Sequence, residues 1–376
     1  MEVKKLSDIS EIRLSNIDKK TELNEETVKL CNFTDVYKNF SINNKKAESF
    51  MIATANDSEI RNLSLKEGYV AITKDSETRD DIGMSCYVDE DLQNVVLGYH
   101  CALIKPNNKI ILGKYLNCFL NSKTARKFFS NQASGSGQRY TLGIESIGKI
   151  AIPLPSLDIQ NKIGTILLNI DKKIQINSQI NDELFEMLHQ IYNFEILNKH
   201  FSKKSSSQVK KSVIKDFASI KTGKEYANYG SDKGRYRFFS CSDDILWGKD
   251  FAFEGRSVIV STHGDFRAFF YNGKFNTYFC DAVLSPFDNS YYGLLYMAIN
   301  TFLPTLKHKS GGSVIKFISN ENILNIPVFL PENEKVLDVM NNCLDLIQHN
   351  TDEIIYLKKI SEELLPLLIN GQVKIN

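Results

Sequence analysis

The chain has 376 residues, of which 42% are apolar, so it is longer than one typical domain and can fill two hydrophobic cores. Its 46 basic and 45 acidic residues give a net charge of +1, which argues against a chain that binds nucleic acid through bulk positive charge alone. A reader that borrows positive surface from a partner is compatible with this balance.

Seven cysteines are present, an odd number, and no two of them have the C-x-x-C spacing of many zinc sites. This pattern argues against a disulfide framework and favours a reducing cytoplasm. Residues 1–5 are not followed by an apolar segment, so no signal peptide is predicted. No stretch approaches the roughly 20 apolar residues that cross a membrane, so we expect no membrane contact.

Residues 1–155 form the first predicted domain. Short β-like runs alternate with loops rich in Asn, Asp and Ser, and one longer stretch has helical character. The β-like runs are 68–72, 95–97 and 101–104, and the helical stretch is 113–131. This mixture predicts an α+β domain.

Residues 156–197 have the period of a helix. Steps of four and three select one apolar seam, which is the spacing of a coiled coil. The seam consists of Ile163, Leu167, Ile170, Ile174, Asn177, Asn181, Leu184, Leu188 and Ile191. A basic linker is expected at 198–211, and lysines continue to residue 224. We favour a solvated linker over the alternative, a strip that faces phosphates.

Residues 212–331 form the second predicted domain, and 332–370 form the second predicted helix before a tail, 371–376. The strand candidates of this domain are 257–261, 269–271, 276–279 and 282–284, and its helix candidate is 291–303. The seam of the second helix consists of Val336, Met340, Cys343, Ile347, Asn350, Ile354, Leu357, Ser361 and Leu364.

The two predicted domains repeat one another. Similar segments occur in the same order in both, which indicates a duplicated, pseudo-symmetric chain. The matched pairs are 6–12 with 214–220, 102–106 with 282–286, 116–122 with 295–301, 134–135 with 310–311, and 150–155 with 326–331. Two similar units, each followed by a long helix, suit the reading of two half-sites on a duplex.

The two long helices are predicted to pair with each other in antiparallel fashion. Each has roughly 35 residues, about 50 Å, and exposes too apolar a stripe to stay helical alone. Asn177 and Asn350 fall at the same step of the two seams, where a polar residue fixes register at a cost in stability. The alternative is that each helix packs back on its own domain.

The chemistry that is missing is also informative. The sequence has no Walker-type phosphate loop, no complete dinucleotide-binding glycine motif, no H-E-x-x-H, no G-x-S-x-G and no Pro-Pro. We therefore expect no catalytic residue, no metal site and no cofactor bound by this chain. His263, in a polar loop, is more readily interpreted as a binding residue than as a catalytic one.

Two segments carry a resemblance to a known family. The first is Gly135-Ser136-Gly137-Gln138 followed by the Ile-x-Ile-Pro-Leu-Pro-like strand 150–155, Gln160 and Ile163; the second is 364–373. Together with the duplication, they resemble the specificity subunit of type I restriction–modification systems. Ile159 replaces the usual acid before Gln160, and the second copy departs further, with Ser310-Gly311-Gly312-Ser313 in place of the glycine motif.

The resemblance implies a non-catalytic DNA reader. Each domain would be a target recognition domain, and the helices would set the spacing of two half-sites on double-stranded DNA. Two modification subunits carrying S-adenosylmethionine would methylate adenine, and restriction subunits would translocate and cut. The rival interpretation is a coiled-coil protein-interaction scaffold without a DNA role.

Candidate DNA contacts in the first domain surround the glycine motif. Glycines let backbone N–H groups approach phosphates, glutamine pairs with adenine, and arginine pairs with guanine. The candidates are Ser134, Gly135, Ser136, Gln138, Arg139 and Tyr140. The alternative is an ordinary flexible loop.

Candidate contacts in the second domain interleave basic and aromatic residues. They are Lys221, Lys224, Arg235, Tyr236, Arg237, His263, Arg267, Lys309 and Ser310. Alternation along a strand would put Arg235 and Arg237 on one face. The alternative is a half-buried strand whose arginines cap its polar face. On the DNA interpretation, replacing Arg237 with alanine should affect the second half-site alone.

Overall fold

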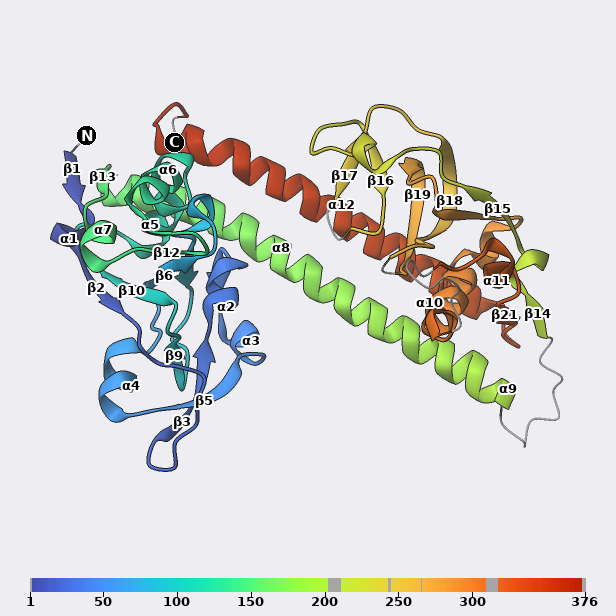
Figure 1. The fold of residues 1–376 in the computed structure, drawn as a ribbon, viewed down its shortest axis with the longest axis horizontal. Helices are drawn as coiled ribbons and strands as arrows, with labels where there is room; N and C mark the ends of the chain where they lie inside the picture. The colour runs from blue at the N-terminus through green and yellow to red at the C-terminus, as the bar shows by residue number, and fades with distance from the viewer. Residues whose placement is uncertain (1, 202–210, 243–244, 265, 309–316, 374–376) are drawn as a thin grey trace. The chain divides into compact units, whose positions relative to one another are not determined.

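The computed structural model describes residues 2–201, 211–242, 245–264, 266–308 and 317–373 (Figure 1). The chain divides into two compact units with separate hydrophobic cores. Unit 1 comprises Met1–Gln175 with Ile354–Asn376, and unit 2 comprises Ile176–Glu353. Each unit combines sheets, short helices and parts of two long helices, so the expected α+β class is confirmed.

Unit 1 is built on two main sheets. The five-stranded sheet has the order β2 (Ser10–Leu14), β10 (Cys101–Pro106), β6 (Val70–Thr73), β8 (Ser85–Val88), β4 (Ser41–Ile42). The three-stranded sheet has the order β5 (Met51–Ala55), β3 (Glu26–Cys31), β9 (Val95–Leu97). Strands β6, β8, β9 and most of β10 are buried along their length, because helices and the second sheet cover their faces.

Smaller sheets and helices complete unit 1. The small sheets are β1 (Glu2–Lys5) with β13 (Ala151–Leu154), and β11 (Ser134–Ser136), β12 (Arg139–Thr141) and β7 (Asp75–Ser76). The helices are α1 (Leu6–Ile9), α2 (Phe33–Tyr37), α3 (Asn44–Ala47), α4 (Asp57–Leu63), η1 (Arg79–Asp81), α5 (Gly113–Leu120), α6 (Lys123–Gln132) and α7 (Ile144–Gly148). The single helix predicted at 113–131 is wrong: it is broken where Ser122 accepts a hydrogen bond from the Ala125 N–H and begins a second helix.

Unit 2 is built on one six-stranded sheet. Its order is β15 (Ala218–Thr222), β20 (Ala282–Pro286), β18 (Phe253–Val260), β19 (Ala268–Thr277), β16 (Tyr236–Phe239), β17 (Leu246–Gly248). Around it lie β14 (Lys211–Val213) paired with β21 (Pro327–Phe329), α10 (Tyr292–His308), α11 (Asn320–Leu324), and the short turns η3 (Ile214–Asp216), η4 (Ala227–Tyr229) and η5 (Asn289–Tyr291). The run predicted at 269–271 lies on the single long strand β19, which also contains the first two residues of the run predicted at 276–279.

The two long helices are α8 (Leu157–Ile191) and α12 (Lys335–Ile369), each of 35 residues as predicted. A π-helical turn, η2 (Tyr192–Asn198), and α9 (Lys199–Phe201) extend α8. In unit 1 the start of α8 shares a core with the end of α12, through Leu167 and Leu368 among others. In unit 2 the end of α8 shares a core with the start of α12, through Leu188 and Met340.

The antiparallel pairing of the helices is therefore confirmed within each unit. The seam residues that lie in these shared cores or pack against them are Ile163, Leu167, Ile170 and Leu364 in unit 1, and Leu184, Leu188, Ile191, Val336, Met340, Cys343 and Ile347 in unit 2. Ile174, Ile354 and Leu357 are partly buried. The globular part of each unit contributes to the same core, so pairing and packing back on the domain occur together.

Polar residues interrupt the seam in unit 2. Asn177 donates from Nδ2 to Glu353 Oε2 at 2.6 Å, and Asn350 donates from Nδ2 to Asn181 Oδ1 at 2.9 Å. Asn181 in turn donates to Thr351 Oγ1 at 3.3 Å. These side chains find partners on the facing helix, so they favour one register over its neighbours.

The duplication extends to individual hydrogen bonds. The Leu6 N–H donates to the Ile150 carbonyl at 3.0 Å, and the Ile214 N–H donates to the Ile326 carbonyl at 3.1 Å. Strand β2 pairs antiparallel with β10 as β15 pairs with β20. The two units thus share a central arrangement of strands and helices, although the three-stranded sheet β5-β3-β9 of unit 1 has no counterpart among the described residues of unit 2.

All seven cysteines are free thiols. Five are buried, Cys280 is partly exposed and Cys241 is exposed. Among the described residues, no cluster of three or more His, Cys, Asp or Glu is placed to hold a metal ion. In the same part of the chain, no helix is both long and apolar enough to cross a membrane.

Candidate nucleic-acid interface

The glycine motif of unit 1 forms a tight hairpin. Strands β11 and β12 pair with Ser136 opposite Arg139, which leaves Gly137 and Gln138 as a two-residue turn. Gly137 has a φ of +76°, and glycine at this first turn position is typical of a type II′ hairpin. Gly135 has a φ of +123°, and a Cβ there would lie 2.2 Å from the Arg139 carbonyl oxygen. Gln138 is therefore presented at an exposed tip.

A buried carboxylate lies at the base of this hairpin. Asp75 Oδ2 is 3.0 Å from Lys74 Nζ, 2.9 Å from His100 Nδ1 and 3.5 Å from Arg139 Nη2. The Asp75 side chain is only 9% exposed, whereas His100 and Arg139 are 43% and 60% exposed. Burial alone would raise the pKa of Asp75, but hydrogen bonds from His100, Thr141 and Lys74 outweigh it and lower this pKa. Asp75 thus remains ionised and holds the side chains of Lys74, His100 and Arg139 around it.

Aromatic rings lie among these charges. Lys74 Nζ is 4.5 Å from the centre of the Tyr99 ring, which meets the His100 ring edge-on at 4.8 Å. The Arg79 guanidinium is 5.2 Å from the Tyr140 ring. Cations and exposed π-faces together suit phosphates and bases. We call Lys74, Asp75, Tyr99, His100 and Arg139 the Asp75 cluster.

Sequence reasoning found Arg139 and its neighbour Tyr140 but missed the other four members of the Asp75 cluster. Lys74 and Asp75 follow the predicted strand 68–72, and Tyr99 and His100 directly precede the strand predicted at 101–104. Because β6 and β10 pair antiparallel, these two strand ends meet. The available signal was therefore a set of polar and aromatic residues at the ends of two adjacent strands.

Unit 2 has an equivalent position with different side chains. The Ile318 N–H donates to the Thr262 carbonyl at 3.0 Å, as the Leu142 N–H donates to the Lys74 carbonyl at 2.8 Å in unit 1. His263 therefore occupies the place of Asp75. It stacks on Phe317 at 6.0 Å, and its Nδ1 lies 2.9 Å from Thr262 Oγ1.

Exposed aromatic residues flank this position in unit 2. Tyr226 and Phe279 are 68% and 39% exposed, with ring centres 5.1 Å apart. The Phe279 N–H donates to the Glu225 carbonyl at 2.7 Å, which ties together the turns that carry the two rings. Lys221 at the end of β15 and Lys224 just after it are exposed.

A second basic and aromatic group lies near the start of β16. The exposed Arg235 has its guanidinium 5.5 Å from the Tyr236 ring, and that ring is 5.0 Å from Phe251. Lys274 Nζ lies 4.6 Å from the Phe251 ring. Sequence reasoning missed Phe251 and Lys274, because they come from a loop and a strand distant in sequence.

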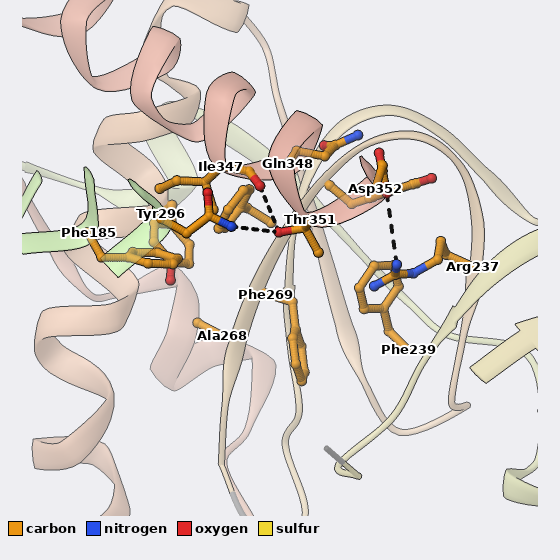
Figure 2. A pocket seen from close by; sticks show the side chains of 13 residues that line it. Phe185, Arg237, Phe239, Ala268, Phe269, Tyr296, Ile347, Gln348, Thr351 and Asp352 are labelled. Carbon is orange, nitrogen blue, oxygen red and sulfur yellow. Dashed lines mark hydrogen bonds and ion pairs between the residues drawn. The ribbon is translucent and has the colours of Figure 1, made fainter. Parts of the chain in front are cut away.

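Arg237 does not belong with these exposed residues. Its side chain is 13% exposed and lies 3.9 Å from Asp352 on α12. It also lies within 6 Å of the rings of Phe239, Trp247 and Tyr271, and it lines the interior pocket in Figure 2. Burial lowers the pKa of Arg237, opposed by the carboxylate of Asp352. Arg237, predicted above as a DNA contact, faces α12 and lies apart from the exposed group around Arg235.

The remaining candidates fall in different places. Arg267 is partly buried, and its carbonyl accepts from the Ser261 N–H at 2.9 Å. Ser134 is exposed, and Tyr140 is partly buried. Lys309 and Ser310 lie outside the described residues. The structure therefore brings Arg139 and Tyr140 into one group and Arg235 and Tyr236 into another.

Comparison with known proteins agrees with this architecture. Residues 1–186 and 206–359 match the family model described as "Type I restriction modification DNA specificity domain". These matches cover most of the chain and include both copies of the duplicated fold. The chain belongs to this family, and the resemblance inferred from its sequence is confirmed.

Individual relatives match over shorter stretches. The HindI specificity subunit of Haemophilus influenzae is 31% identical over 118 residues, which are 31% of this chain and 26% of the relative. The EcoDI specificity subunit of Escherichia coli is 26% identical over 161 residues, or 41% and 36% of the two chains. The matched segments thus span about a quarter and about a third of these relatives.

A solved structure shares the fold along nearly the whole chain. The type I restriction–modification S subunit from M. genitalium superposes with a TM-score of 0.63 at 14% identity, covering 98% of this chain and 95% of that one. At this identity the match concerns the fold alone. The duplicated α+β units with two long helices are therefore a shared architecture.

Proposed function

We propose that this chain is the non-catalytic subunit that selects the DNA target of a type I restriction–modification complex. Each globular part would read one half-site of an interrupted sequence on double-stranded DNA. The observation that carries the proposal is the pair of equivalent positions occupied by Asp75 and His263. One fold with two different sets of side chains at the same place is what a reader of two different half-sites requires.

In unit 1 the groups available for reading bases are the exposed cations and the amide of the hairpin. Arg139 can pair with the two acceptors of guanine, and Gln138 with the donor and acceptor of adenine. Asp75 would hold His100 and Arg139 in place through its ionised carboxylate. The backbone N–H groups of the glycine turn would meet phosphates.

In unit 2 the reading groups would be aromatic and basic. Tyr226, Phe279 and Phe317 are exposed and can contact the methyl groups and faces of bases. Lys221, Lys224 and Arg235 would contact phosphates. This composition differs from that of unit 1, which supports two distinct half-sites.

The near-neutral chain would depend on its partners for affinity. A net charge of +1 supplies little attraction for a polyanion, so positive surface on modification subunits would complete the binding site. These partners would carry S-adenosylmethionine, and restriction subunits would translocate and cut. Ile176, Ile180 and Met187 on α8 are 51%, 41% and 39% exposed, which supports a partner that covers this helix.

Sequencing of native DNA with a modification-sensitive method tests the proposal. Cells with the modification subunit would be compared with and without this chain. Methyladenine in a two-part interrupted motif only when the chain is present is the expected result. Unchanged methylation with a folded, expressed chain would contradict the proposal and favour the interaction scaffold.

A further inference from the structure

In unit 2, one face of α12 makes a polar contact with each of three consecutive strands. Asp345, Gln348 and Asp352 are spaced by three and four residues, so they share this face. Asp345 Oδ2 accepts from Arg256 Nη2 on β18 at 2.5 Å, and Asp352 lies 3.9 Å from Arg237 on β16 (Figure 2). Gln348 contacts β19, the strand between these two.

The Gln348 side chain contacts strand β19 only through the backbone of the strand. Its Oε1 accepts from the Asn272 N–H at 2.8 Å, and its Nε2 donates to the Asn272 carbonyl at 3.0 Å. Both polar backbone groups of one residue are thus held by one side chain, as a neighbouring strand would hold them. Because no side chain of the strand takes part, the contact does not depend on the side chain at position 272, provided that the residue is not proline.

Unit 1 has a glutamine contact at the equivalent step of α8, but this one uses side chains as well as a backbone carbonyl, and its Nε2 also donates to Asp171 Oδ2 of the same helix at 2.7 Å. Gln175 is 7% exposed, and its Nε2 donates to the Ser41 carbonyl at 3.3 Å and to Ser41 Oγ at 3.0 Å. Its Oε1 accepts from Asn43 Nδ2 at 3.2 Å. Gln175 and Gln348 occupy matching positions in the duplicated helices, two residues before the seam asparagines.

An ion pair accompanies each glutamine, with reversed charges. Three residues before Gln175, Lys172 Nζ lies 2.7 Å from Asp89 of the first domain. Three residues before Gln348, Asp345 pairs with Arg256 of the second domain. If the first domain sat on the second helix, Asp89 would meet Asp345, and the two like charges would repel.

We propose that Gln175 and Gln348 are positioning residues that fix the rotation and height of each recognition domain on its helix. The inference rests on the proposed function, since its consequence is the distance between half-sites. The glutamines hold each domain at one height, and the ion pairs assign each domain to its own helix. The spacer length of the DNA target would then follow from these contacts together with the helices.

The test uses the full chain with its modification subunit and a set of targets with both half-sites at different spacer lengths. Wild type is expected to direct methylation at one spacer length. Gln348→Ala should still recognise both half-sites. Its methylation of the target with the wild-type spacer should fall at least several-fold, and its methylation of targets with spacers one base pair shorter or longer should rise. Gln190→Ala is the matched control, because this exposed glutamine bonds only to Glu186 on its own helix among the contacts described.

A second measurement needs no DNA. Hydrogen exchange of the Asn272 amide should be roughly two- to tenfold faster in Gln348→Ala than in wild type, as expected for one lost hydrogen bond. Gln348→Glu, which keeps an acceptor for that amide but loses the donor, should fall between the two and guards against misfolding of the alanine variant.

The outcomes distinguish failure of the positioning role of Gln348 from failure of the proposed function. Unchanged exchange at Asn272, or an unchanged spacer profile despite faster exchange, would overturn the positioning role. If wild type directs no interrupted methylation at all, the proposed function fails, and the exchange experiment still decides whether Gln348 holds the strand.

Discussion

A single buried carboxylate positions two exposed side chains of unit 1, His100 and Arg139. Asp75 is ionised because three hydrogen bonds outweigh the cost of its burial, and it therefore holds His100 and Arg139 at fixed positions. Side chains fixed in this way lose less conformational entropy on binding than free arginines. Discrimination between bases should depend on the exposed members of the Asp75 cluster.

Replacing Arg139 with alanine should relax the first half-site only. The loss of a bidentate contact to one base should reduce discrimination there by about 1–3 kcal/mol, or about five- to 150-fold. Methylation of targets with single changes in either half-site measures this. Arg61→Ala, which removes an exposed arginine of the same unit, is the control. An equal loss of methylation on all target sequences would instead identify Arg139 as a phosphate contact.

Asp281 should make the stability of unit 2 depend on pH. This residue is 1% exposed, and burial raises its pKa to about 7 despite hydrogen bonds from Thr277 and Ser261. The folded state therefore retains a proton between about pH 4 and 7 that the unfolded state has lost. The contribution of protonated Asp281 to the stability of the folded state is present at low pH and is lost as pH rises to 7.

The Asp281→Asn variant, which stays neutral, tests this dependence. Its stability relative to wild type should grow by about 1.4 kcal/mol per pH unit from pH 4 to 7 and then level off. Denaturant unfolding at several pH values measures the difference. If the difference in free energy of unfolding between the variant and wild type does not change with pH, Asp281 has the same pKa in the folded and unfolded states.

At the scale of elements, the helical seam is specified by polar contacts as well as by apolar packing. Asn350 and Asn181 face each other in unit 2, where an unpaired amide would be costly. Asn350→Leu should destabilise the protein by about 1–3 kcal/mol, because it removes a partner of Asn181. The double variant Asn181→Leu/Asn350→Leu should recover most of this loss. Thermal unfolding of wild type, Asn181→Leu, Asn350→Leu and the double variant measures the coupling between the two asparagines. Additive losses of stability would show that they are not coupled.

The period of the sequence predicts the elements better than it predicts their contacts. Both 35-residue helices and their seams follow from local spacing, as do the central strands β18, β19 and β20 of the second domain. The Asp75 cluster could not be found this way, because its members come from strand ends more than twenty residues apart. Arg235 and Arg237 were expected on one face, but β16 begins at Tyr236, so alternation does not include Arg235.

The direction in which Arg237 points shows the same limit. A basic residue beside aromatic residues on a strand suits both a DNA surface and the inner face of a sheet. Only the presence of Asp352 on a helix 115 positions later decides between them. Long-range pairing of charges is not visible in local spacing.

For the whole molecule, the two units should act on DNA independently. Within the described parts of the chain, their cores share no residue of the globular parts, and no contact joins the Asp75 cluster and the Arg235 group to a common partner. The free-energy losses of Arg139→Ala and Arg235→Ala on the complete target should therefore add within about 0.5 kcal/mol. Binding of the assembled complex to four targets, with either half-site intact or altered, measures this. A large deviation would indicate coupling through the helices.

The distribution of thiols in the fold has a practical consequence. Cys241 is the one exposed cysteine of the seven, and it lies in unit 2, with its Sγ 4.0 Å from the place of a Cβ on Gly264 in the loop that carries His263. A maleimide fluorophore should therefore attach mainly at this position without mutagenesis. Its emission would report occupancy of the second half-site separately from the first, which gives an optical assay for that half of the target.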